Sequence, residues 1–269
     1  MHISTTKVET NLSETLQPVI QGFLPVSLEA MDKVAFMDRF DKKFVFHSSK
    51  LLLILRKVQP HYSVLQINNH RFFEYSTLYY DTAGYDMYLS HHNRRLTRMK
   101  VRKREYLTTG QMYFEIKKKN NKGKTRKKRI TTENLHKVLS KEEKKFICRQ
   151  TPFNPEKLEP KLTNRFTRIT LTSNIFAERI TIDFNIRYRM NSQSAFLHNI
   201  VIVEIKIDGE TRKSDFERIL SECSVNPMRL SKYCIGSILL DKRLKYNRFK
   251  SKLITLQKIS DDGTFASIH

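Results

Sequence analysis

Apolar and charged residues alternate along several stretches of the chain with the two-residue period of a β-strand. In the clearest stretch, 96–104, Met99 and Val101 share one face and four basic residues share the other. The basic residues are Arg98, Lys100, Arg102 and Arg104. In a helix these four would be scattered around the axis, so the pattern favours a strand.

Across the turn 107–110, a second stretch sets Phe114 and Ile116 opposite Glu115 and Lys117. We therefore predict a β-hairpin with one apolar and one charged face. The same alternation predicts further strands at 39–46, 72–81, 166–172, 179–184 and 201–208. These segments together are enough for an antiparallel sheet or barrel of about eight strands.

Helical periodicity is weaker and predicts fewer elements. The expected helices are Lys50–Val58 with Ser48 or Ser49 as its cap, Thr132–Ile147, Ser214–Cys223 and Ser231–Leu244. The chain shows no internal repeat and no low-complexity linker. We expect one domain over residues 26–247, with an N-terminal arm (1–25) and a C-terminal tail (248–269).

The composition excludes several classes of protein. Fifty Lys and Arg oppose 27 Asp and Glu, a net charge of +23, but 17 Phe and 11 Tyr are too many for a disordered chain. No apolar run approaches the ~18 residues of a membrane span, and the first residues lack the apolar stretch of a signal peptide. The cysteines (Cys148, Cys223 and Cys234) lack metal or redox spacing, and their odd number suits a reducing compartment.

The positive charge is concentrated in one segment. Residues 94–129 hold 16 Lys or Arg and two Glu, which is +14 of the +23. An anionic partner is therefore expected: nucleic acid, a phosphorylated metabolite or an acidic membrane surface. The loop Lys117–Arg129 is the best candidate for a nucleic-acid patch, although a solvated hairpin tip explains it equally well and it lacks interleaved aromatics.

Three predicted strands carry an acid and a base two residues apart on one face. These pairs are Asp41/Lys43, Glu115/Lys117 and Glu204/Lys206. One reading is a solvated face with weak cross-strand ion pairs. If these faces instead turn inward, the interior of the sheet is strongly positive and needs a polyanion to be stable. The carboxylates would then suit a divalent cation that bridges to phosphate oxygens. Lys232, just after the Ser231 cap, is either an anion ligand at a helix start or a surface lysine.

The order of these motifs resembles one family. The motifs that follow the pattern of this family are, in chain order, Arg39-x-Asp41-x-Lys43-Phe44, Ser76-x-Leu78-Tyr79-Tyr80-Asp81-Thr82, Tyr85-x-x-Tyr88-Leu89, Arg98-x-Lys100-Val101-Arg102-x-Arg104, Glu115-Ile116-Lys117, Arg179-Ile180-Thr181-Ile182-Asp183, Glu204-Ile205-Lys206 and Ser231-Lys232-Tyr233. Over roughly residues 36–242 the chain resembles the VTC domain, the polyphosphate polymerase domain of the vacuolar transporter chaperone complex and its bacterial relatives. That domain belongs to the triphosphate tunnel metalloenzymes.

The resemblance implies an α+β fold of the CYTH-like type: a closed antiparallel β-barrel, or tunnel, of about eight strands with flanking helices. It implies transfer of the terminal phosphate of ATP to polyphosphate with Mn²⁺ or Mg²⁺, so the expected partners are ATP and polyphosphate or pyrophosphate. It further implies a cytoplasmic protein that is compatible with a membrane-protein partner, and no specific nucleic acid.

Site residues are carried over from the family's motifs. The catalytic set is Lys43, Lys100, Arg102, Lys117, Arg168, Arg179 and Lys232, and the metal-binding carboxylate is Glu204. Weaker candidates for substrate binding are Arg39, Arg98, Arg104, Lys127, Phe166 and Lys206.

The chain departs from the hydrolytic relatives at their opening motif, Glu-x-Glu-x-Lys. Arg39 and Asp41 stand in place of its two glutamates, which removes a potential metal ligand and favours the polymerase branch. Two alternatives stay open: a tunnel triphosphatase that hydrolyses tripolyphosphate or nucleoside triphosphates, and a non-enzymatic binder of polyanions or nucleic acid.

Overall fold

The computed structural model describes residues 11–32, 39–122, 124–133, 138–208 and 214–260, and leaves the side chains of residues 32, 39, 40 and 208 undescribed. The strands are β1 (Leu24–Val26), β2 (Arg39–His47), β3 (Tyr62–Leu65), β4 (Phe73–Thr82), β5 (Arg98–Tyr106), β6 (Gln111–Lys119), β7 (Thr125–Thr131), β8 (Leu158–Ser173), β9 (Glu178–Met190), β10 (Gln193–Leu197) and β11 (Ile200–Asp208). The helices are α1 (Leu12–Gln21), α2 (Leu28–Asp32), α3 (Leu51–Val58), α4 (Asp86–His92), α5 (Lys141–Gln150), α6 (Asp215–Glu222), α7 (Lys232–Leu240) and α8 (Lys250–Ser260).

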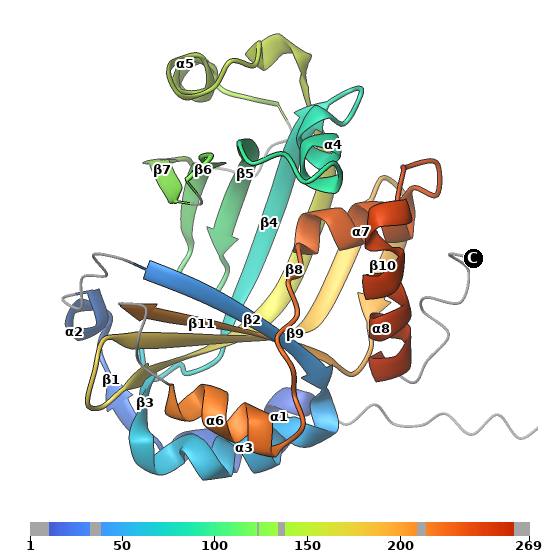
Figure 1. Cartoon of the computed structure of the whole chain (residues 1–269). Coiled ribbons are helices and arrows are strands. Elements are labelled where there is room, and N and C mark those ends of the chain that lie inside the picture. Colours follow the sequence, from blue (N-terminus) through green and yellow to red (C-terminus); the bar gives the residue numbers. More distant parts are fainter. Residues whose placement is uncertain (1–10, 33–38, 123, 134–137, 209–213, 261–269) are drawn as a thin grey trace, which may run out of the picture.

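The strands form one sheet, whose main path is β2-β11-β9-β8-β4-β5-β6-β7. Every ladder along this path is antiparallel, while β1 pairs with β3 in parallel. All strands predicted from the alternation are present. The sheet bends strongly, so that β2 and β11 run across the direction of β4, β5 and β6 (Figure 1).

The main path does not close into a barrel, because no ladder joins β7 to β2 among the described residues. Instead, Met228 donates its N–H to the Lys43 carbonyl at 2.7 Å on the free edge of β2. Farther along the same segment, Ser231 accepts a hydrogen bond from Lys100 of β5 at 2.9 Å. The segment that leads into α7 therefore links the edge strand β2 to β5, and Figure 1 shows it crossing β2 on its way to α7. The α+β class with flanking helices is confirmed, and the closed barrel is not.

The outer face of the sheet is covered by helices on both halves. Apolar residues of β2, β8, β9 and β11, such as Phe44 and Ile182, are fully buried against α1, α3 and α6, which lie together beneath these strands (Figure 1). On the other half, Phe114 of β6 and Tyr80 of β4 pack near Ile147 of α5. Because one face of each strand is committed to these cores, the charged positions are left on the opposite face.

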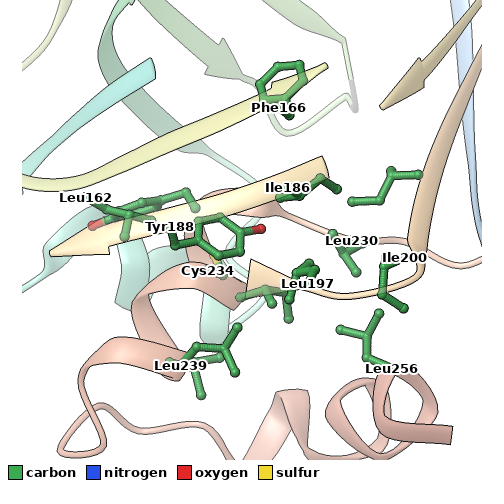
Figure 2. Packing of buried hydrophobic residues seen from close by; sticks show 14 of the residues in the cluster. Leu162, Phe166, Ile186, Tyr188, Leu197, Ile200, Leu230, Cys234, Leu239 and Leu256 are labelled. Atoms are coloured by element: carbon green, nitrogen blue, oxygen red, sulfur yellow. The ribbon is translucent and has the colours of Figure 1, made fainter. Parts of the chain in front are cut away.

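A third core, shown in Figure 2, fixes α7 against the sheet. Leu162, Ile186 and Tyr188 of β8 and β9 face α7 and α8. At Gly236 an added Cβ would lie 2.4 Å from the Tyr188 ring and 2.8 Å from Leu162, so only glycine allows this close approach. The approach positions the N-terminus of α7, with Lys232, at the charged face.

Two predicted helix starts are wrong. Residues 48–50 form a 3₁₀ turn capped by the His47 side chain, so Ser48 and Ser49 do not cap α3. Helix α5 begins at Lys141 and not at Thr132, because Ser140 and Glu143 form a capping box there. The Ser214 and Ser231 caps are present as expected.

Parts of both predicted terminal segments form helices that pack on the core. Leu16 and Ile20 of α1 are fully buried, and so is Leu256 of α8. The division into arm, domain and tail stays a prediction. Within the described ranges, no helix has the length and apolar character that crossing a bilayer demands.

One buried ion pair lies on the outer face, away from the other charges. Lys103 and Glu143 are 3.1 Å apart with side chains 1% and 2% exposed. Removing one partner of such a pair leaves the other buried and uncompensated, so Lys103→Met is expected to cost about 3–5 kcal/mol of folding free energy. Chemical denaturation measures this loss, and the folded variant should bind anions as the parent does. A loss below about 1 kcal/mol would contradict the structural role.

Candidate functional site

Basic side chains from six strands and α7 gather on the inner face of the sheet, opposite α1, α3, α5 and α6. This inner-face cluster comprises Lys43, Lys100, Arg102, Arg104, Lys117, Lys127, Arg168, Lys206 and Lys232 with the carboxylates Glu115, Asp183 and Glu204. When all nine basic groups are protonated, they exceed the three carboxylates of the cluster by six positive charges. Such an excess within one face favours a multiply charged anion.

Glu204 of β11 is the centre of the first group. Lys43 of β2 lies 2.9 Å from its carboxylate and Lys206 lies 3.8 Å away. Burial opposes the charged form, but Lys206, Lys43 and Lys117 hold the pKa of Glu204 well below its usual range. The carboxylate is therefore ionised at all physiological pH values and limits the repulsion between these lysines.

Asp183 of β9 organises the second group. Arg168 of β8 donates to both of its oxygens, at 2.6 and 2.8 Å, and Lys232 at the start of α7 bonds to the same carboxylate. Burial acts against ionisation, yet these two cations keep the pKa of Asp183 far below normal. Arg168 also lies over the ring of Phe166, with 5.3 Å between its Cζ and the ring centroid.

Glu115 of β6 organises the third group. Arg102 of β5 donates to it at 2.7 and 2.8 Å, and Lys127 of β7 lies 2.5 Å from its other oxygen. Glu115 is fully buried, and these cations together with Arg104 lower its pKa despite the desolvation. Arg104 donates to Thr77 of β4 at 3.2 Å.

Lys117 lies where the groups meet. Its direct cross-strand partners are both lysines, Lys100 on β5 and Lys127 on β7. Burial lowers the pKa of Lys117 to about 7; Glu204 opposes this shift, while Arg102, Lys100 and Lys43 add to it. Like charges directly opposite each other are destabilising, so this arrangement is one that a bound anion would relieve.

Two of the expected site residues lie at the border of the cluster but bond elsewhere: Arg179 is directly opposite Lys206, and Arg98 precedes Lys100 by two residues on the same face of β5. Arg179 donates to the carbonyl of Met31 at 2.6 Å, near the end of α2. Arg98, at the start of β5, donates to the Arg95 carbonyl at 3.1 Å. The side chain of Arg39 lies outside the described residues.

Sequence reasoning missed the aromatic residues of β4 and the role of Asp183 as the partner of two cations. Tyr75 stacks on Phe166 at 5.1 Å, and Arg168 lies 5.0 Å from its centroid. Although burial acts to raise it, the pKa of Tyr79 is lowered, because four cations led by Arg102 and Lys100 favour its phenolate. Alternation along β4 could have placed Tyr75 and Tyr79 beside Thr77 on this face. The position of Asp183 between Arg168 and Lys232 depends on how α7 docks.

The donor set fits a divalent cation only together with a substrate. Among the described residues, no three His, Cys, Asp or Glu side chains are grouped as a metal site. Glu204, 17% exposed, supplies one carboxylate. Mg²⁺ typically binds one or two carboxylates and completes its shell with phosphates and water. Glu204 would thus hold a metal jointly with a phosphate ligand.

The Lys117 pKa predicts a pH dependence of anion binding. Below about pH 7 the lysine is protonated, and a bound phosphate raises its pKa further, so affinity falls as pH rises above 7. The loss reaches at most about tenfold per pH unit for one proton. Lys117→Arg keeps its charge and should flatten this part of the profile. Calorimetric titration of tripolyphosphate with chelator present measures both proteins, and parallel profiles would contradict the assignment.

Comparison with known proteins gives one matching family and several similar solved structures. The family model of the VTC domain matches residues 38–240. No curated protein matches. Among solved structures, a candidate adenylyl cyclase from Hippeastrum with a dominant triphosphatase activity is similar at TM-score 0.48 and 13% identity, over 74% of this chain and 95% of that one.

Two bacterial structures are similar to about the same extent. A candidate adenylate cyclase from Bacillus halodurans has TM-score 0.44 and 13% identity, over 72% of this chain and 96% of that one. Another from Vibrio parahaemolyticus has TM-score 0.42 and 14% identity, over 73% of this chain and 97% of that one.

Proposed function

Because the chain belongs to the VTC domain family, and so to the triphosphate tunnel enzymes, we propose that it is a polyphosphate polymerase. In this proposal it transfers the terminal phosphate of ATP to the end of an inorganic polyphosphate chain. Pyrophosphate or polyphosphate serves as acceptor, and ADP is released.

The observation that supports the proposal most is the uneven charge of the inner-face cluster. Each of its three carboxylates is already bound to two or more cations, and Lys100 and Lys117 still lie directly opposite each other. Linear phosphate chains bring about one negative charge per phosphate along their length, which matches cations spread over several strands. A single phosphate would neutralise only a part of the cluster.

The partial burial of the cluster strengthens these contacts. The side chains of Arg102, Arg168, Lys206 and Lys232 are only 13–16% exposed. Cations held in a site with little water interact with phosphate more strongly than surface lysines do. Limited water also favours transfer to a phosphate acceptor over hydrolysis.

The reaction needs no protein nucleophile. A terminal oxygen of the acceptor chain attacks the γ-phosphorus of ATP in line, the bond to the bridging oxygen of ADP breaks, and ADP leaves with that electron pair. The attacking oxygen is already ionised, so no base is required. Arg168, with its planar fork, and Lys43 and Lys232, as point charges, would hold the phosphates and stabilise charge in the transition state.

A divalent cation on Glu204, when bound, would neutralise charge on the phosphate oxygens and polarise them. Lys43 and Lys206 flank the same carboxylate and orient it. Where the hydrolytic relatives have a first glutamate, this chain has Arg39, so the first acid of their motif is missing. This difference favours transfer over metal-assisted hydrolysis.

Product analysis tests the proposal. The purified chain is incubated with ATP, Mn²⁺ and a pyrophosphate primer, and the products are resolved on a gel. A ladder of polyphosphates with matching ADP is expected. Orthophosphate as the sole product, from ATP or tripolyphosphate, would identify a triphosphatase instead. Binding without any turnover, under Mn²⁺ or Mg²⁺, would identify a non-enzymatic polyanion binder.

A further inference from the structure

A groove with a volume of about 510 Å³ lies between α8, the end of β2 and residues 224–228. Its basic residues are Lys50, Lys252 and Lys258, accompanied by His47, and Ser251 and Thr255 add hydroxyl groups. None of the described residues that line it is acidic. The size is within the ~300–1,000 Å³ of ordinary ligand sites.

The composition of the groove suits a phosphate ligand. Lysines supply mobile ammonium groups, and hydroxyls donate to phosphate oxygens. Lys50 is held in place because its Nζ donates to the Cys223 carbonyl at 2.9 Å. A concave surface that holds three cations and no acid repels itself when empty, and an anion removes the repulsion.

One end of the groove meets the inner-face cluster. Met228 lines the groove and donates its N–H to the carbonyl of Lys43, a member of the cluster, at 2.7 Å. On the other side, the Nζ of Lys252 lies 5.7 Å from the centroid of Phe249, whose ring is 6.0 Å from that of His91 on α4. The groove therefore lies between β2 and α8, and the first turn of α8 lies near α4.

Cations of the cluster and of the groove both act on His91 of α4, which marks the junction between the two sites. Arg98 on β5 is the cross-strand partner of Lys119 on β6, and this pair lies two residues along each strand from the pair of Lys100 and Lys117. Burial is the main cause that lowers the pKa of His91 to about 2, and the nearby cations Lys100, Arg98 and Lys252 add to the shift. His91 is thus neutral and surrounded by cations from β5, β6 and α8. Asp41 is the acid that acts on Lys119 at this end.

We propose that this groove is an exit subsite for the polyphosphate product. Phosphates that pass Lys100 are received by Arg98 and Lys119 at the junction and then by Lys252 and Lys258 in the groove. The proposal rests on the proposed function, because a chain long enough to span both sites is the ligand that uses their continuity. A small phosphate compound would need the groove alone.

The test measures binding of premade polyphosphate and requires no turnover. Long-chain polyphosphate and tripolyphosphate are titrated separately into the parent protein, Lys258→Glu and Lys252→Gln, with chelator present. Lys258→Glu should weaken long-chain binding about tenfold at low salt and leave tripolyphosphate binding within about twofold. Lys145→Glu, the same charge change at an exposed position of α5, is the control and should change neither.

A second readout uses the polymerase reaction. Lys258→Glu should keep the initial rate with a short primer, within about twofold, while its longest products become shorter. Unchanged long-chain affinity in both groove variants would overturn the exit subsite, whether or not the protein polymerises. If Lys258→Glu weakened the binding of tripolyphosphate and of long-chain polyphosphate equally, and bound one tripolyphosphate fewer per protein, the exit subsite would also be overturned. The groove would then be an independent site for small phosphates. Loss of long-chain affinity in a protein without turnover would support the subsite and refute the polymerase.

Discussion

Replacing Arg168 by alanine is expected to lower the rate of phosphoryl transfer by about a thousandfold, in the range found for arginines that stabilise transferring phosphates. A guanidinium has five N–H donors, and Asp183 accepts two of them from Arg168. The substitution removes a planar cation from the site and leaves Asp183 with Lys232 alone. Initial rates with ATP, Mn²⁺ and primer, normalised to folded protein, measure the effect.

Arg168→Lys is the matched variant for this experiment. It keeps the charge but cannot fork onto a carboxylate or phosphate, so its rate should lie between those of the parent and Arg168→Ala. Thermal unfolding should show that Arg168→Ala is less stable, because a buried carboxylate loses one partner. A rate within about tenfold of the parent in folded Arg168→Ala would contradict the role of Arg168 in transfer.

Replacing Glu204 by glutamine is expected to separate turnover from anion binding. Turnover with Mn²⁺ should fall about a thousandfold, because the variant loses the carboxylate that would hold the metal. Metal-free binding of tripolyphosphate should stay equal or become tighter, since one negative charge leaves a site where Lys43 and Lys206 remain. Kinetics with Mn²⁺ and calorimetry with chelator measure the two effects.

Glu217→Gln is the control for Glu204→Gln. Glu217 of α6 lies 2.8 Å from Lys42, whose side chain lies on the outer side of β2, and the substitution should change neither turnover nor binding. A Glu204→Gln variant with the parent's turnover would exclude Glu204 as the metal carboxylate. A folded variant that loses metal-free binding would show that Glu204 acts by positioning its lysines.

The strands and their charged faces are predictable from sequence because the two-residue period is local. Arg102 and Lys100 lie on the inner face and Val101 lies in the core, as the alternation indicates. Lys103 shows the limit of the pattern: it lies on the apolar face, where Glu143 of α5 neutralises it. That partner is 40 positions away, and nothing in the local sequence indicates it.

Contacts that depend on docking are not predictable in this way. The ion pair of Asp183 with Lys232 requires the close approach of α7 at Gly236, and barrel closure depends on which segment bonds to the edge of β2. Likewise, the basic groove joins Lys50 to Lys258 across more than 200 positions. The family resemblance indicates which basic residues belong to the site, but it contains no information on this groove.

The central claim is that the inner-face cluster passes the terminal phosphate of ATP to another phosphate. The most direct measurement follows that phosphate: ATP labelled at the γ-position is incubated with the chain, Mn²⁺ and primer, and the label is separated into polyphosphate and orthophosphate. We expect most of the transferred label to be recovered in polyphosphate, in proportion to the ADP formed. Recovery of the label as orthophosphate, with the primer unextended, would contradict it.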